Sequence, residues 1–182
     1  MRYFVNKLSI LIFFGFSACS LTPGHIKSFH NDKLQKIHQS YVDTVKQANR
    51  DLNRHWQHGR LGNMTVNLDG SPNVGLCYHW QEIVYVGIQP AIKKTGWRAV
   101  GIAINEGNFL EHHAVLVYDP QQVEFEKILK TQYQSNSYVL DPWKTGKPRI
   151  YSLKNWLALP FSIEKPARLT TVANFRLTGY KP

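Results

Sequence analysis

Residues 97–118 read WRAVGIAINEGNFLEHHAVLVY, and this stretch decides the fold class. Its two apolar parts, residues 97–104 and 109–118, are rich in the β-branched and aromatic residues that favour strands. The intervening residues 105–108 read NEGN, a composition typical of turns. The pattern predicts two antiparallel strands joined as a hairpin.

The segment upstream of the hairpin predicts two helices. Apolar residues recur there every three or four positions, as on one face of a long helix: Leu34, Ile37, Tyr41, Val45, Ala48, Leu52 and Trp56. Asn31 or Asp32 can cap the start of this helix, and Gly59 can end it. A second helix is expected from about residue 74 to residue 88 or slightly beyond, with Gly96 closing it.

The remaining segments predict loops and short strands. Residues 59–73 are expected to be a loop with one short strand at 64–68, and residues 121–130 a short helix. Further strands are expected at residues 138–140, 149–153 and 169–177. Helices followed by an antiparallel sheet indicate an α+β domain, with the N-terminal helices packed on the sheet.

Composition excludes several classes of protein. With 182 residues and 43% hydrophobic residues, the chain can bury a core and is not wholly disordered. Only two cysteines, Cys19 and Cys77, exclude a disulfide scaffold and a multi-cysteine zinc site. The net charge of +10 comes from cations without the interleaved exposed aromatics of a nucleic-acid groove, so nucleic acid is not an expected partner. A protein that binds a membrane surface through charge remains an alternative.

The N-terminus predicts export. Arg2 and Lys7 are followed by the apolar residues 8–16, LSILIFFGF, and by the small residues Ser17 and Ala18. This order is typical of a signal peptide, and the apolar run is short for a permanent membrane span.

Small residues directly before Cys19 resemble the lipobox of bacterial lipoproteins, although Phe16 stands where that family usually has leucine. The resemblance implies cleavage after residue 18 and lipid attachment at Cys19. The domain organisation is then a signal peptide (1–18), a tether (19–30) and one domain (31–182), anchored in the bacterial cell envelope on the periplasmic side or at the cell surface. An ordinary signal peptide with a chance cysteine is the alternative.

Three short segments carry the residues of a cysteine nucleophile site: GLCYHW at 75–80, EHHAV at 111–115 and YVLDPW at 138–143. Cys77 falls in the first turn of the second expected helix. The helix dipole and the unpaired N–H groups there stabilise a thiolate, and the same groups can hold an oxyanion. Cys77 is therefore the candidate nucleophile.

The candidate general acid and base is His113, and Asp141 is the candidate orienting carboxylate. His113 shares a strand face with Val115, whereas His112 points to the other face, so a register shift of one residue would exchange the two histidines. Asp141 ends the next expected strand and could reach the far nitrogen of the histidine ring.

The ordered trio resembles the bacterial transglutaminase-like cysteine proteinases of the papain-like superfamily. The matching pieces are Gly75-Leu76-Cys77, His113-Ala114-Val115 and Leu140-Asp141-Pro142-Trp143. The resemblance implies a papain-like fold and a thioester acyl-enzyme that hydrolyses or transfers acyl groups at amide bonds of a protein, peptide or cell-envelope substrate. This family also takes an oxyanion side chain from upstream of the cysteine, and Asn73 is the candidate here.

Structural readings of the same residues stay open. Cys77 could be a buried structural thiol and Asp141 a turn carboxylate before proline, which would make the chain an inactive envelope lipoprotein that serves as a binding module or scaffold. The nearby histidines and Glu111 have no known zinc-ligand spacing, so no metal or cofactor is expected. A monomer is expected.

Overall fold

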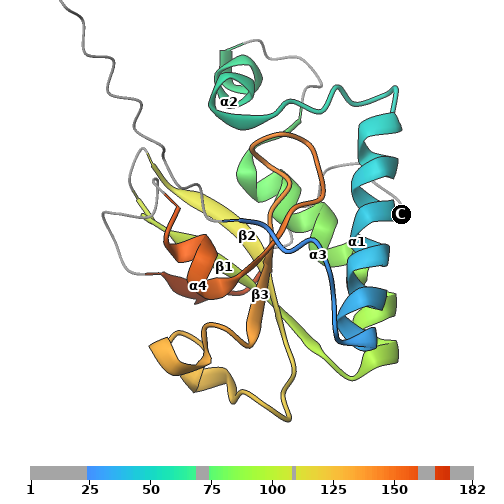
Figure 1. Ribbon diagram of the computed structural model, residues 1–182. Coiled ribbons are helices and arrows are strands. Elements are labelled where there is room, and N and C mark those ends of the chain that lie inside the picture. The colour runs from blue at the N-terminus through green and yellow to red at the C-terminus, as the bar shows by residue number, and fades with distance from the viewer. Residues whose placement is uncertain (1–23, 69–73, 108–109, 160–166, 173–182) are drawn as a thin grey trace, which may run out of the picture.

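The computed structural model describes residues 24–68, 74–107, 110–159 and 167–172. Within them, five antiparallel strands form one sheet in the order β4-β3-β2-β1-β5 (Figure 1). The strands are β1 (Arg98–Ile104), β2 (His112–Tyr118), β3 (Ser137–Leu140), β4 (Ile150–Ser152) and β5 (Arg168–Thr170). The predicted hairpin is confirmed, because β1 and β2 pair from Arg98↔Tyr118 to Ile104↔His112.

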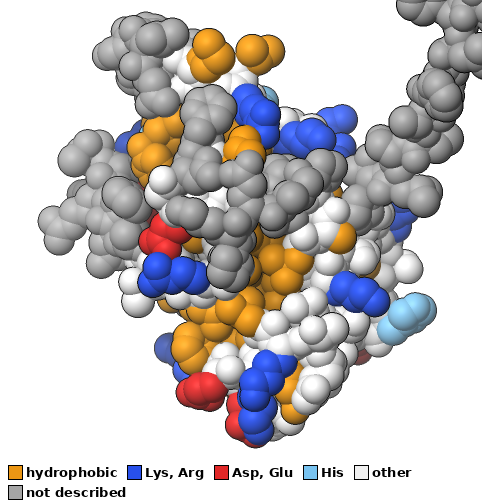
Figure 2. Space-filling model, turned by 90° about the vertical axis from the view of Figure 1, so that its left-hand side faces the viewer, with side chains coloured by type: hydrophobic (Ala, Val, Ile, Leu, Met, Phe, Trp, Pro, Cys, Tyr) orange, Lys and Arg blue, Asp and Glu red, His pale blue; other side chains and the backbone are white. Residues whose placement is uncertain are grey.

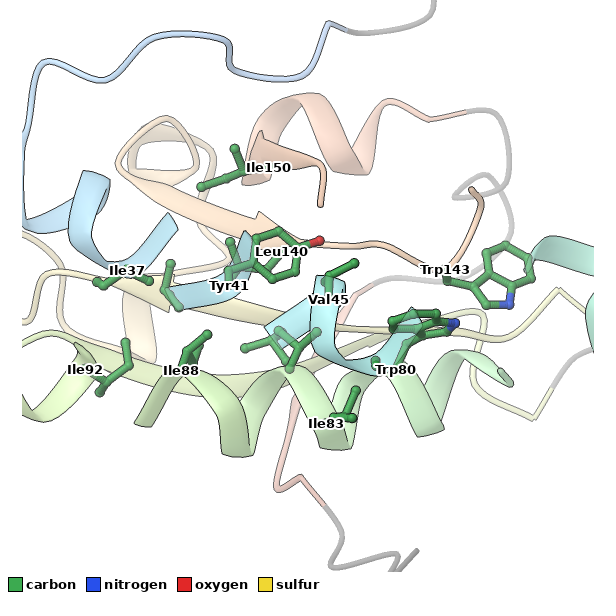
Figure 3. Close-up of a cluster of buried hydrophobic side chains, with 14 of the residues drawn as sticks. Ile37, Tyr41, Val45, Trp80, Ile83, Ile88, Ile92, Leu140, Trp143 and Ile150 are labelled. Atoms are coloured by element: carbon green, nitrogen blue, oxygen red, sulfur yellow. The ribbon is translucent and has the colours of Figure 1, made fainter. Parts of the chain in front are cut away.

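Two long helices cover one face of the sheet, so the predicted α+β class is also confirmed. Helix α1 (Asp32–Arg50) begins at the predicted cap, where the Asn31 side chain accepts hydrogen bonds from two backbone N–H groups. Helix α3 (Cys77–Thr95) ends at Gly96, whose left-handed backbone (φ 74°) favours glycine. Side chains of α1 and α3 interlock over β2 and β3 in a continuous apolar core (Figure 3): Ile37, Tyr41, Val45, Trp80, Ile83, Ile88, Ile92, Leu140, Trp143 and Ile150.

The opposite face of the sheet has its own apolar layer. The short helix α4 (Leu153–Leu157) follows β4 directly and buries Leu153 and Trp156 there. Ile102, Leu116 and Val139 belong to the same cluster. The sheet is therefore covered on both sides, and its central strands are almost free of solvent contact.

A hydrogen-bonded side chain fixes α3 on the sheet. The amide nitrogen of Gln81 donates to the backbone oxygen of Ala114 at 2.6 Å and lies 3.3 Å from that of Ile102. Ile102 and Ala114 are opposite each other in the β1–β2 ladder. The first turn of α3, which carries Cys77, is thereby held at the end of the hairpin.

Helix α2 (Gly59–Leu68) replaces the loop and short strand expected at residues 59–73. Its Gly- and Asn-rich sequence has weak helix propensity. Tertiary contacts support it instead: the N–H of Gly59 donates to the backbone oxygen of Trp143 at 2.8 Å, and the Trp143 indole donates to Asn63 Oδ1 at 3.0 Å. Residues 69–73 of the expected loop lie outside the described residues.

Two other expectations needed correction. The first helix ends at Arg50, well before Gly59, and Trp56 instead pairs with Val74 in an isolated parallel bridge. The segment 121–130 holds a single 3-10 turn, Phe125–Lys127, and a second turn follows at Thr131–Tyr133. The part of the expected strand beyond residue 172 lies outside the described residues.

The expected signal peptide (1–18), Cys19 and the start of the tether lie outside the described residues. The rest of the expected tether contacts the domain: the N–H of Ile26 donates to the backbone oxygen of Ile150 at 2.8 Å, and Phe29 packs on the core. Within the described part of the chain, none of the helices has the length and apolar character needed to cross a membrane.

Candidate active site

Cys77 is the first residue of α3, whereas the sequence predicts it in the first turn of a helix that begins at about residue 74. The preceding Gly75 adopts φ 137°, and a Cβ on it would lie 2.2 Å from the backbone oxygen of Gln57, so this tight approach requires glycine. Leu76, the N-cap residue, makes no side-chain capping hydrogen bond to the first turn. The thiol is 4.0 Å from the backbone oxygen of Glu111 and is buried.

His112 and Asp141 form a buried pair beside this thiol. Nε2 of His112 lies 2.7 Å from Oδ2 of Asp141, and their side chains are 2% and 6% exposed. Cys77 also acts on the His112 ring and raises its pKa, so the thiol lies near the histidine. Because Nε2 is engaged by Asp141, Nδ1 is the ring nitrogen left to meet the sulfur. Histidine and aspartate are thus hydrogen-bonded, and the cysteine lies near the histidine.

Asp141 is held by two further donors. The Trp156 indole donates to Oδ2 at 2.9 Å, and the backbone N–H of Trp143 donates to Oδ1 at 3.2 Å. Burial raises the pKa of Asp141, but the charge and hydrogen bond of His112, together with these two donors, lower it below its usual value. Asp141 is consequently a carboxylate at neutral pH.

The charge of Asp141 in turn affects the pKa of His112. Burial lowers the pKa of His112, but the charge and hydrogen bond of Asp141, followed by the hydrogen bond and charge of Cys77, raise it to about 10. An imidazolium is therefore stabilised between the two acidic groups, which is the state that an activated thiolate needs beside it.

His113 does not occupy the position expected for it. Its Nε2 lies 2.6 Å from Oε1 of Glu111, whose other oxygen accepts a hydrogen bond from the Gly107 N–H at 2.6 Å. The expected contact of His113 with Cys77 and Asp141 is wrong, and His112, the competing residue, makes these contacts.

The strand register explains the correction. Val115 pairs with Leu140, so Asp141 continues the register opposite Ala114. His112 lies two residues from Ala114 on the same face, which makes it the diagonal neighbour of Asp141. His113 does share its face with Val115, as expected, but Asp141 lies on the other face, where the His112 side chain projects.

Two indole rings border the histidine. The ring centroid of Trp143 is 4.6 Å from that of His112, and the ring centroid of Trp156 is 5.8 Å away. Trp143 was part of the sequence motif, whereas Trp156 and its bond to Asp141 were missed, because nothing in the sequence places residue 156 beside residue 141. The Trp143 indole is in turn held by Asn63 of α2.

His79 has a structural contact next to the site. Its Nδ1 accepts a hydrogen bond from the Gly75 N–H at 3.2 Å. Burial, and then the positive charge of Arg54, lower the pKa of His79 to about 4, so the ring is neutral and able to accept this bond at pH 7. His79 thus supports the backbone turn before Cys77.

Asn73, the expected oxyanion side chain, lies outside the described residues. The groups in the described region with suitable chemistry are the backbone N–H groups of the first turn of α3. No cluster of three or more histidine, cysteine, aspartate or glutamate side chains that could hold a metal ion occurs among the described residues. The arrangement can deprotonate a thiol and return the proton to a leaving group.

Comparison of the chain with protein-family models, with curated proteins and with solved structures found no match.

Proposed function

We propose that this protein is an exported, lipid-anchored cysteine enzyme of the transglutaminase-like group, with a papain-like fold. It would hydrolyse or transfer acyl groups at amide bonds of a protein, peptide or cell-envelope substrate. The observation that carries the proposal is the position of His112, which hydrogen-bonds to Asp141 and lies near enough to Cys77 for the cysteine to raise its pKa.

In the proposed resting state the proton of Cys77 is on Nδ1 of His112, and in the first step the thiolate sulfur attacks the substrate carbonyl carbon. The negative charge passes to the carbonyl oxygen, where N–H groups at the start of α3 stabilise it. When the tetrahedral intermediate collapses, the C–N bond breaks and His112 donates its proton to the leaving amine. A thioester on Cys77 remains.

The second step reverses these roles. A water molecule or an amine gives its proton to His112 and attacks the thioester carbon, and the C–S bond breaks. The sulfur leaves as a thiolate beside the protonated His112, which restores the resting pair. Throughout, Asp141 remains ionised and stabilises the imidazolium.

The place of action follows from the first residues of the chain. The basic start, the apolar residues 8–16 and the small residues before Cys19 support export and lipid attachment. Substrates of the enzyme would then belong to the cell envelope or be proteins and peptides exposed there.

The experiment is to trap the acyl-enzyme in the full chain carrying Cys19→Ser, so that Cys77 is the sole thiol. An activated ester is added at pH 6.5, and the intact mass is recorded. We expect one acyl group per chain on Cys77, released by hydroxylamine, and none in the matched Cys77→Ala variant. Acylation no faster than that of free cysteine would contradict the proposal.

A second candidate is an inactive envelope lipoprotein of the same fold that acts as a scaffold. The burial of the trio favours it, since Cys77, His112 and Asp141 are 5%, 2% and 7% exposed. A scaffold role predicts that neither the activated ester nor iodoacetamide modifies Cys77 in the folded chain, whereas both modify it after unfolding in guanidinium.

A further inference from the structure

Exposed apolar side chains gather before and on α2. Five large hydrophobic residues are exposed in the described region, and three of them are Leu52, Leu61 and Met64, at 89%, 79% and 58% exposure. Leu61 and Met64 are three residues apart on one helix, so they share a side of α2. An apolar helix side exposed to water is costly unless something covers it.

Helix α2 cannot turn this side inward, because its other side is already attached to the domain. The Trp143 indole donates to Asn63, and the Gly59 N–H donates to the Trp143 backbone. Gly62 packs so closely on Gln57 that a Cβ there would lie 2.8 Å from the Gln57 Cβ. The exposure of Leu61 and Met64 is thus built into the fold.

Four exposed cations lie on α2 and on the segments next to it: Arg50, Arg60, Lys144 and Lys147. Arg60 belongs to α2, and the backbone of Lys144 lies against Gly59. Asn49, next to Arg50, donates to the backbone oxygen of Gly146, next to Lys147. The end of α1, helix α2 and the turn after β3 therefore form one end of the molecule (Figure 1).

Apolar and basic side chains lie side by side along this end of the molecule in Figure 2. The nearby carboxylate of Asp51 is half-buried and accepts a hydrogen bond from the Asn53 N–H at 3.0 Å. Exposed leucine and methionine beside lysine and arginine form a surface suited to the interface of an anionic membrane.

We propose that α2 docks on the surface of an anionic bilayer, with Leu61 and Met64 entering the headgroup region and the four cations contacting lipid phosphates. The short length of the proposed tether supports a bilayer as the surface on which α2 docks. The backbone oxygen of Gly24 accepts a hydrogen bond from the Asn155 side chain of the domain. Only four residues lie between Cys19 and Gly24, so the reach from one to the other is at most about 18 Å. With Cys19 lipidated, the domain stays at the bilayer.

Docking would also present the candidate active site to the membrane surface. Asn63 of α2 holds the Trp143 ring, and that ring lies on His112. Resting on the proposed function, this arrangement favours amide substrates located at the bilayer surface. The docking surface itself needs no catalysis, so the two proposals can fail separately.

The test is hydrogen exchange, followed by mass spectrometry, on the full chain carrying Cys19→Ser. Exchange of the peptides that cover residues 52–64 is compared with and without vesicles of phosphatidylglycerol and phosphatidylcholine. We expect about tenfold slower exchange with these vesicles, little change with pure phosphatidylcholine, and loss of the effect in high salt. Because exchange is measured only in peptides covering residues 52–64, vesicle binding by α2 is distinguished from binding by the apolar N-terminal residues.

Matched variants decide the assignment. Leu61→Glu/Met64→Glu is expected to abolish the slowing, and Val86→Glu/Phe125→Glu, which alters the other two exposed hydrophobic residues, is expected to keep it. Far-ultraviolet circular dichroism checks that both variants fold. Equal behaviour of the two variants, or slowing by pure phosphatidylcholine alone, would overturn the proposal. Slowing that depends on protein concentration without vesicles would also overturn it, by indicating a second copy as the occupant.

Discussion

Two adjacent histidines of the same chain each pair with a carboxylate, and their surroundings differ. His112 and Asp141 are 2.7 Å apart and buried, whereas His113 and Glu111 are 2.6 Å apart with side chains 17% and 35% exposed. The distances are nearly equal. The comparison teaches that a short histidine–carboxylate distance does not by itself identify a catalytic pair.

The two pairs differ in burial and in the further groups that contact them. Asp141 receives an indole N–H and a backbone N–H besides its histidine, and His112 has the thiol of Cys77 on its other side. Glu111 also receives a backbone N–H, from Gly107 in the hairpin turn. Out of water, charge interactions are stronger, so the buried pair is the one able to hold a charged histidine beside a thiol.

Replacing His112 or His113 is expected to give the largest difference between the two pairs, in the rate of acylation of Cys77. His112→Gln should slow acylation of Cys77 by about 10²–10⁴-fold, because the group that moves the proton is lost. His113→Gln should leave the rate unchanged, since its ring is bound to Glu111. The rate constant for ester acylation at pH 6.5 measures both. A loss confined to His113→Gln would reverse our assignment.

Replacing Asp141 or Glu111 should show that the two pairs contribute differently to the free energy of unfolding. Asp141→Asn is expected to lower the free energy of unfolding by about 3 kcal/mol, because a buried pair loses one partner. Glu111→Gln should cost less than about 1 kcal/mol, as for partly exposed pairs. Urea denaturation at pH 7 gives both values, and similar losses would mean that burial does not distinguish the pairs.

Removing the indole N–H of Trp156 affects only the buried pair of His112 and Asp141. Trp156→Phe should cost about 2 kcal/mol, the usual range for a hydrogen bond to a charged group. It should also raise the pKa of Asp141, because the bond from Trp156 lowers it. Trp97→Phe is the matched control: Trp97 is buried, and its indole nitrogen has no hydrogen-bond partner among the described residues. If both variants lost the same stability, ring packing would account for the loss.

The pH dependence gives the smallest expected effect. The pKa of His112 is raised from 6.5 to about 10, so its contribution to stability is full below pH 6.5 and falls as the pH rises toward 10. One group contributes at most about 1.4 kcal/mol per pH unit.

Between pH 7 and pH 8, the free energy of unfolding of the native chain should therefore fall by about that amount relative to Asp141→Asn. Glu111→Gln should keep the native slope. Urea titrations at the two pH values provide the test, and parallel slopes in all three proteins would show that His112 is not held in its charged form.

Local patterns were sufficient where local contacts decide the structure. The hairpin follows from a turn sequence between two β-forming stretches, and the end of α3 follows from Gly96. Cys77 was correctly placed at a helix start for the same reason. Helix α2 was missed, because contacts with Trp143, far along the chain, hold a weakly helical sequence in place.

The histidine that pairs with Asp141 could not be identified from sequence periodicity. Alternation along β2 assigns His112 and His113 to opposite faces, but it does not say which face meets Asp141. That depends on the pairing of Val115 with Leu140, a register between strands joined by a long connection. Trp156 depends in the same way on the packing of α4 against the sheet.

The Gln81 amide has a consequence for protein engineering. A helix laid on a sheet by apolar packing alone can slide along it at low cost, because hydrophobic contact has no direction. A side chain directed at backbone oxygens of two strands gives α3 a fixed coordinate along the ladder. Anyone transplanting this helix to a new scaffold to carry a nucleophile should carry the glutamine with it, since the helix alone would bring the sulfur but not its alignment.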